Sequence, residues 1–161
     1  MLGIWTSCGT KAESYSHTTQ TSIEVDTLQT PTDTIDRSSL LGVHKYVLSQ
    51  TCTYSGCHDG HFEPDFRTVQ SSYSTLVYQP ILKNNAKEEF QYRVIPFDTA
   101  RSVLYERITN CCFVNQDDRM PQSTIGEPLA QKDIDAVGQW IMEGAKDIFG
   151  ESSKAPEENL Q

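Results

Sequence analysis

Two cysteines and a histidine lie close together in the segment Cys-Thr-Tyr-Ser-Gly-Cys-His, which runs from Cys52 to His58. The segment is similar to Cys-x-x-Cys-His, the pattern through which c-type haem is attached, but four residues separate the cysteines instead of two. In that chemistry the two thiols add across the haem vinyl groups, and the adjacent histidine then lies beneath the iron. Ser55 and Gly56 favour a turn, so the extra residues can loop out. We expect Cys52 and Cys57 to carry haem c, and His58 to ligate its iron.

The same segment also holds the donors of a tetrahedral zinc site, namely Cys52, Cys57, His58 and His61. Structural zinc sites usually draw their ligands from two separated pairs, whereas these four lie within one short segment. A redox-active dithiol is a third interpretation, but the Cys-x-x-Cys spacing that is typical of that chemistry is missing. The residues of this segment alone leave a zinc-binding module open as an alternative.

A haem iron with one histidine needs a second axial ligand, or it keeps an open position. The three methionines are Met1 near the N-terminus, Met142 within an expected helix and Met120 in a loop-like segment. Pro121 restricts Met120 to extended backbone angles, which suits a loop that presents a thioether. We therefore expect Met120 to be the second ligand. The alternatives are that Met120 only fills the core, or that His44 or His17 ligates the iron instead. Histidine and methionine together leave no open position and indicate electron transfer rather than catalysis.

Four segments with the apolar spacing of helices must position these residues. The expected helices cover residues 40–48, residues 64–77, residues 99–109 and residues 131–143. Ser38 or Ser39 can cap the first helix, Pro64 and Asp65 open the second, and Gly144 ends the last. A loop or short strand is expected at residues 92–96. The sequence thus predicts a small all-α domain of about four short helices.

The flanking segments have a different composition from the folded segment, residues 37–150. Residues 9–36 are rich in Ser and Thr and cannot bury enough apolar surface to fold, so we expect a flexible linker. The polar residues 151–161 are expected to be a disordered tail. Residues 1–8 resemble the end of a bacterial lipoprotein signal, in which Cys8 would be acylated. An ordinary free thiol is the alternative for Cys8.

The overall charge narrows the classes of partner. The chain has 161 residues, a formal net charge of -9 and a pI of about 4.8. Phosphate binding needs clustered Lys and Arg, so nucleic acid is excluded as an expected partner. An acidic surface favours basic partners. No run of 18 apolar residues is present, so the sequence predicts no transmembrane helix.

Three ordered blocks of the chain resemble monohaem cytochrome c domains of the planctomycete and Bacteroidetes type. The first block, at 56–68, contains Gly-Cys-His-Asp-Gly and Glu-Pro-Asp-Phe-Arg-Thr. The second block, at 96–108, contains Pro-x-Asp and Ser-Val-Leu-Tyr-x-Arg-Ile. The third block begins with Asp-Arg-Met-Pro at 118–121 and continues with Pro-Leu at 128–129 and the helix at 134–145. The resemblance implies a class I cytochrome c fold, covalent haem c and a methionine ligand matching Met120. It also implies export, because haem c is attached outside the bacterial cytoplasm. The longer cysteine spacing and the neighbours Cys111 and Cys112 depart from this family.

Several further residues have an expected role beside the haem. Arg93, Arg107 and Arg119 are candidates to pair with the haem propionates through a planar fork, although surface or helix-pairing roles are the alternative. Trp140 is expected to pack on the haem or its adjacent helix, as part of the core. Cys111 and Cys112 are expected to be thiols, because a disulfide between sequence neighbours would be strained.

Together these features predict an exported electron carrier, periplasmic or on the cell surface, that is tethered to a membrane only through acylated Cys8. Its expected partners are redox proteins, such as other cytochromes or a respiratory complex, which it would meet in brief and small contacts. A haem enzyme or gas sensor with an open iron site is the main alternative, and a zinc-binding module is the second.

Overall fold

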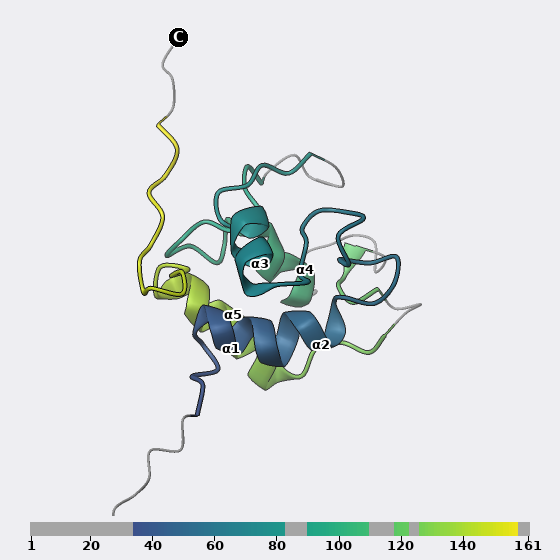
Figure 1. The fold of residues 1–161 in the computed structure, drawn as a ribbon. Helices are drawn as coiled ribbons and strands as arrows, with labels where there is room; N and C mark the ends of the chain where they lie inside the picture. The colour runs from purple at the N-terminus through teal and green to yellow at the C-terminus, as the bar shows by residue number, and fades with distance from the viewer. Residues whose placement is uncertain (1–33, 83–89, 110–117, 123–125, 158–161) are drawn as a thin grey trace, which may run out of the picture. The chain divides into compact units, whose positions relative to one another are not determined.

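The computed structural model describes residues 34–82, 90–109, 118–122 and 126–157 (Figure 1). These residues all belong to one compact unit, Asp33–Gln161. Its helical elements are α1 (Leu40–Val43), η1 (His44–Leu48), α2 (Ser49–Thr51), α3 (Val69–Leu76), α4 (Val103–Thr109) and α5 (Gln131–Met142). The described residues form isolated β-bridges but no strand. The prediction of a mostly helical protein is therefore confirmed.

The first three elements, α1, η1 and α2, follow one another without a break and form one helical segment, which we call the first helix. Ser39 caps it, because its side-chain oxygen accepts a hydrogen bond from the Gly42 N–H at 3.1 Å. The middle of the first helix, His44–Leu48, is π-helical. The first helix ends beside Cys52, whose N–H still donates to the Leu48 carbonyl at 3.0 Å. It therefore delivers the first cysteine of the sequence motif at its C-terminal end.

Helix α3 begins five residues later than the sequence predicted, at Val69 instead of Pro64. The Thr68 hydroxyl accepts from the Ser71 N–H at 3.0 Å, and the Ser71 hydroxyl accepts from the Thr68 N–H at 3.1 Å. This reciprocal capping box satisfies two backbone donors and sets the start of the helix. The expectation that Pro64 opens the helix was wrong, and Phe66 is buried in the connecting segment instead.

Helix α4 also begins later than expected, at Val103, whereas α5 lies within one residue of its predicted bounds. The Ser102 hydroxyl accepts from the Ile95 N–H at 2.8 Å and donates to the Asp98 carbonyl at 2.6 Å. These bonds hold the residues before Val103 in turns. Gly144 follows α5 with φ of +103°, the left-handed conformation that favours glycine at a helix end.

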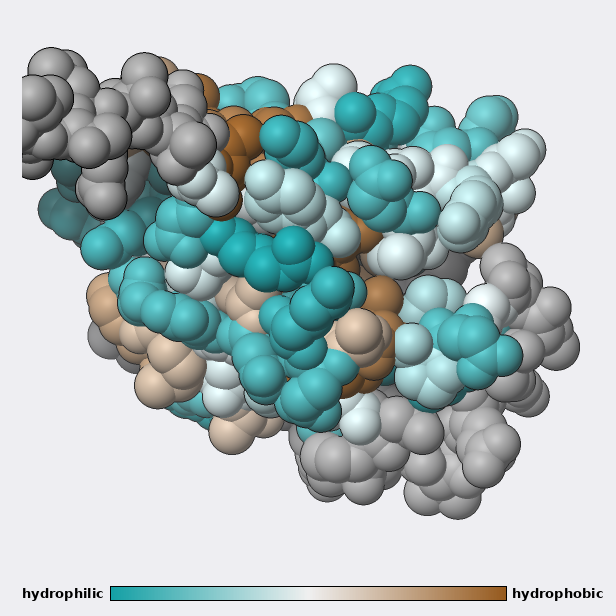
Figure 2. Space-filling view, turned by 90° about the horizontal axis from the view of Figure 1, so that it is seen from below, coloured by the Kyte–Doolittle hydropathy of each residue, from teal (hydrophilic) through white to brown (hydrophobic). Residues whose placement is uncertain are grey.

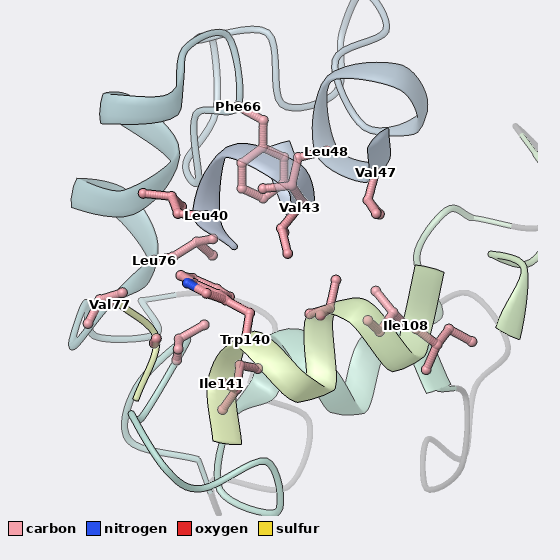
Figure 3. Packing of buried hydrophobic residues seen from close by; sticks show 14 of the residues in the cluster. Leu40, Val43, Val47, Leu48, Phe66, Leu76, Val77, Ile108, Trp140 and Ile141 are labelled. Atoms are coloured by element: carbon pink, nitrogen blue, oxygen red, sulfur yellow. The ribbon is translucent and has the colours of Figure 1, made fainter. Parts of the chain in front are cut away.

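Helix α5 packs against both the first helix and α4. Trp140 is the largest fully buried side chain among the described residues, and its indole N–H donates to the Lys146 carbonyl at 3.0 Å. Figure 3 shows Leu40 and Val43 of the first helix and Leu76 of α3 around this ring. The face drawn in Figure 2 is largely hydrophilic, with hydrophobic residues visible between polar ones. The core thus joins all four helical segments.

The start of the first helix tolerates no side chain at Gly42. A Cβ atom there would lie 2.0 Å from the Asp36 carbonyl oxygen and 2.7 Å from the Arg37 Cα. Both are backbone atoms, so Gly42→Ala should lower the free energy of unfolding by about 1–3 kcal/mol, despite the better helix propensity of alanine. Urea denaturation measures this change. The exposed substitution Gln50→Ala on α2 is the control and should stay within about 0.5 kcal/mol of wild type. A Gly42→Ala protein as stable as the control would contradict the close packing.

The structure bears on the expected absence of a membrane-spanning helix and on part of the expected flanking segments. No helix in the described ranges combines the length and apolar character that crossing a bilayer requires. Residues 151–157 form no helix or strand, although the Ser153 and Tyr73 hydroxyl oxygens lie 2.8 Å apart. The linker expected at residues 9–36 and the end of the tail lie largely outside the described residues and stay predictions.

Candidate functional site

One cavity of about 710 Å³, which we call the large cavity, lies among the helices. Ligand pockets in proteins typically have about 300–1,000 Å³. Its apolar walls come from the first helix, α3, α4 and α5, and include Val47, Leu48, Leu76, Val103, Leu104, Ile108 and Val137. These helices thus enclose a space suited to a large, apolar ligand.

Both cysteines of the motif and the adjacent histidine line the large cavity. The loop between the cysteines closes on itself, because the Cys57 N–H donates to the Tyr54 carbonyl at 2.8 Å and the His58 N–H to the Cys52 carbonyl at 3.1 Å. Gly56 has φ of +81°, which a residue with a side chain rarely adopts. The longer spacing is thereby absorbed by an exposed loop. Cys52 and Cys57 are both free thiols and half-buried.

His58 is held in the tautomer that a metal ligand needs. Its Nδ1 lies 2.8 Å from the Pro64 carbonyl oxygen, which can only accept, so Nδ1 carries the hydrogen and Nε2 keeps a free lone pair. The ring packs on Phe66 with 4.8 Å between the ring centroids. Burial lowers the pKa of His58, and the charges of Arg93 and Arg107 lower it further, against the Pro64 hydrogen bond. The imidazole is therefore kept neutral.

Met120 lines the large cavity together with Pro121, although it lies far along the chain from the cysteines. Its N–H donates to the Arg107 carbonyl at 2.9 Å, which ties this segment to α4. The side chain is half-buried. The structure therefore gathers two thiols, an imidazole and a thioether around one apolar space.

Two of the three candidate arginines line the large cavity. Arg93 is buried, and its Nη1 donates to the Thr75 carbonyl at 2.7 Å and to the Glu63 carboxylate at 2.9 Å. Arg107 donates through Nη1 to the Asp118 carbonyl at 2.8 Å, and burial lowers the pKa of its guanidinium. A largely buried cation at a ligand cavity is a suitable partner for a carboxylate.

The other two residues proposed as cofactor contacts, Arg119 and Trp140, are not among the residues that line the large cavity. Arg119 is buried and its Nη2 donates to the Gly126 carbonyl at 3.3 Å. Trp140 lies in the core, as expected, and its indole N–H is already used by Lys146. The structure thus does not bring these two side chains to the cavity. Cys8, Cys111 and Cys112 lie outside the described residues.

The four donors of a zinc site do not come together. His61 lies at the edge of the large cavity with 78% of its side chain exposed, and its Nδ1 contacts the Asp59 carboxylate at 3.0 Å. Within the part of the chain that the structure describes, no three His, Cys, Asp or Glu side chains form a group that could hold a metal ion. A haem iron differs in this respect, because the macrocycle itself supplies most of its ligands.

Asp59 stabilises the loop between the cysteines through its carboxylate. Its carboxylate accepts a hydrogen bond from the Gly56 N–H at 3.1 Å. This bond and the hydrogen bond from the His61 side chain lower the pKa of Asp59 from 3.8 to about 2. The stability that this carboxylate contributes is present above pH 3.8 and is lost as the pH falls towards about 2.

Asp59→Asn should therefore flatten the acid branch of the stability profile. Asparagine does not titrate, so the urea midpoint of wild type should fall more steeply than that of the variant below about pH 4. Urea titrations at several values between about pH 5 and pH 2 measure both profiles. Parallel profiles over this range would show that Asp59 is not held as a carboxylate in the folded state.

Sequence reasoning missed two features of the site. Pro64 was expected to start a helix, but its carbonyl orients His58, and Glu63 pairs with buried Arg93. Both residues lie in the block at 56–68 that resembles cytochrome c domains, but the sequence pattern does not indicate these two bonds. Comparison with known proteins found no matching family model, no matching curated protein and no matching solved structure.

Proposed function

We propose that this protein transfers electrons through a haem c bound covalently to Cys52 and Cys57, with His58 and Met120 as the iron ligands. The observation that carries the proposal is the convergence of Met120 with the Cys52–His58 segment on one large apolar cavity. Neither segment alone indicates the other, since they are separated by α3 and α4 along the chain. Their convergence supports a cofactor that takes one ligand from each.

The residues present fit haem in size, donors and polarity. The large cavity has about 710 Å³ and takes two thiols from one loop. Three exposed hydrophobic side chains, Tyr54, Phe62 and Leu82, are 57%, 62% and 77% exposed, and all three line this cavity. A flat apolar macrocycle would cover such side chains, which are otherwise costly to leave in water. When bound, haem supplies an iron that changes its charge by one electron.

The iron ligands, the apolar walls and two arginines each have a distinct role in the proposed site. The His58 imidazole, oriented by Pro64, offers Nε2 to a metal, and the soft thioether of Met120 favours the reduced state. The apolar walls exclude water and disfavour extra charge. Arg93 and Arg107 are the candidate partners for two carboxylates of the cofactor, because both residues line the cavity.

Covalent haem also bears on where the protein is located in the cell. Haem c attachment takes place outside the bacterial cytoplasm, so we propose an exported protein, periplasmic or on the cell surface. Acylation of Cys8 and a linker at residues 9–36 would tether it to a membrane. The formal net charge of -9 favours a basic redox protein as its partner.

Binding of carbon monoxide separates electron transfer from a haem enzyme or gas sensor. If Met120 occupies the sixth position, the reduced holoprotein should show little spectral change under carbon monoxide, while Met120→Ala should bind the gas readily. The same preparation should be reduced and reoxidised by small reagents through many cycles. Ready gas binding by the wild-type protein would favour the open-site alternative instead.

A further inference from the structure

The loop between the two cysteines is longer than the usual pattern requires, and it carries an aromatic side chain. Tyr54 lies on this loop and is 57% exposed. Its backbone closes the loop by accepting from the Cys57 N–H at 2.8 Å. The longer loop therefore places Tyr54 between the two cysteines.

A second, smaller cavity of about 250 Å³ adjoins the large cavity, and we call it the side cavity. Four residues line both cavities and thus form the boundary between them: Thr51, Tyr54, Pro121 and Leu129. Tyr54 comes from the inter-cysteine loop, and Pro121 directly follows Met120. The two segments that supply the candidate iron ligands therefore meet at one wall.

The segment around Met120 is anchored on one side by α4. The Met120 N–H donates to the Arg107 carbonyl at 2.9 Å, and Arg107 Nη1 donates to the Asp118 carbonyl at 2.8 Å. On the side of the inter-cysteine loop, Tyr54 and Pro121 both line the boundary between the two cavities.

We propose that Tyr54 is a positioning residue for Met120. Its ring packs at the wall that it shares with Pro121, and so it keeps the Met120 thioether directed into the large cavity. The ring also closes the boundary to the side cavity, which limits the space into which Met120 can withdraw. This role rests on the proposed function, because it has a consequence only where Met120 ligates an iron. The four-residue spacing between the cysteines would thus serve to place Tyr54 beside the Met120 segment.

Competition by added imidazole tests this role in the oxidised holoprotein. Imidazole must displace the Met120 sulfur, so its apparent affinity reports how firmly the thioether is held. Tyr54→Ala should bind imidazole about 2- to 10-fold more tightly than wild type, the range expected for the loss of one aromatic contact. The absorption band of the sulfur–iron(III) bond should weaken in parallel.

Two variants serve as matched controls. Tyr54→Phe keeps the ring and should bind imidazole as wild type does. Phe149→Ala removes an exposed ring that lines neither cavity, and it should also leave the affinity unchanged. Haem content and the circular dichroism spectrum are measured for every variant, so that affinities are compared only between proteins with full haem content.

Three results would overturn the inference: an unchanged affinity in Tyr54→Ala, an equal rise in Phe149→Ala, or an equal rise in Tyr54→Phe. Failure of the proposed function is recognised separately in the wild-type protein, which would then carry no covalent haem or show no sulfur–iron band. The two failures are therefore told apart before any Tyr54 variant is measured.

Discussion

Replacing Met120 with alanine is expected to lower the reduction potential of the holoprotein by on the order of 0.1–0.3 V, with the haem still covalently attached. Axial ligands set haem potentials over a range of about 0.8 V, and a thioether stabilises the reduced iron. Cys52, Cys57 and His58 lie on a separate segment, so the attachment itself should not depend on Met120. Spectroelectrochemical titration of wild type and variant measures the difference.

Met142→Ala is the matched control for this experiment. Met142 lies at the end of α5, is 53% exposed and does not line the large cavity. Its removal should leave the potential within experimental error of wild type. An unchanged potential in Met120→Ala, or an equal decrease in Met142→Ala, would reject the assignment of Met120 as a ligand.

The second large effect is expected from the loss of haem. A cavity costs about 24 cal/mol per Å³ in engineered core variants. For an apolar space of about 710 Å³ this is about 17 kcal/mol, and water entering through the open side makes that value an upper bound. The whole stability of a typical domain is only about 5–15 kcal/mol. The haem-free chain should therefore unfold at a lower temperature and less cooperatively than the holoprotein.

Near-ultraviolet circular dichroism and a thermal scan of the two forms test this expectation. The haem-free form is the Cys52→Ser/Cys57→Ser variant, purified until its spectrum shows no haem, and the holoprotein is the reference. Trp140, in the centre of the core, supplies a near-ultraviolet signal that should be weak without haem. A haem-free chain that unfolds cooperatively at the holoprotein's temperature, with the same signal from Trp140, would mean that the large cavity needs no ligand.

The helices were largely predictable from the sequence because their apolar spacing is regular, whereas their starts depended on side-chain bonds. Proline before a helix is a strong signal, and it placed the start of α3 at Pro64. The Thr68 and Ser71 pair caps the helix later, at Val69. Ser and Thr hydroxyls form such bonds in many contexts, so the sequence offered several candidate caps and no way to rank them.

The candidate site was predictable where its chemistry is local. Cys52, Cys57 and His58 are neighbours, so the sequence alone identified them as one candidate site, although it left both haem and zinc open. Which arginine faces the cavity depends on the packing of distant segments, and the sequence did not distinguish Arg107, which lines the cavity, from Arg119, which bonds to Gly126. Such contacts are set by tertiary packing and leave no pattern of spacing along the chain.

We propose that haem is bound covalently to this chain through Cys52 and Cys57. Haem staining of the denatured protein, produced with export and haem attachment in a bacterial host, tests this attachment, because thioether-linked haem survives denaturation. Wild type should keep the stain and show the mass of the chain plus one haem, while Cys52→Ser/Cys57→Ser should lose both. A wild-type protein without stain, carrying zinc in a metal analysis instead, would rule out the covalent haem.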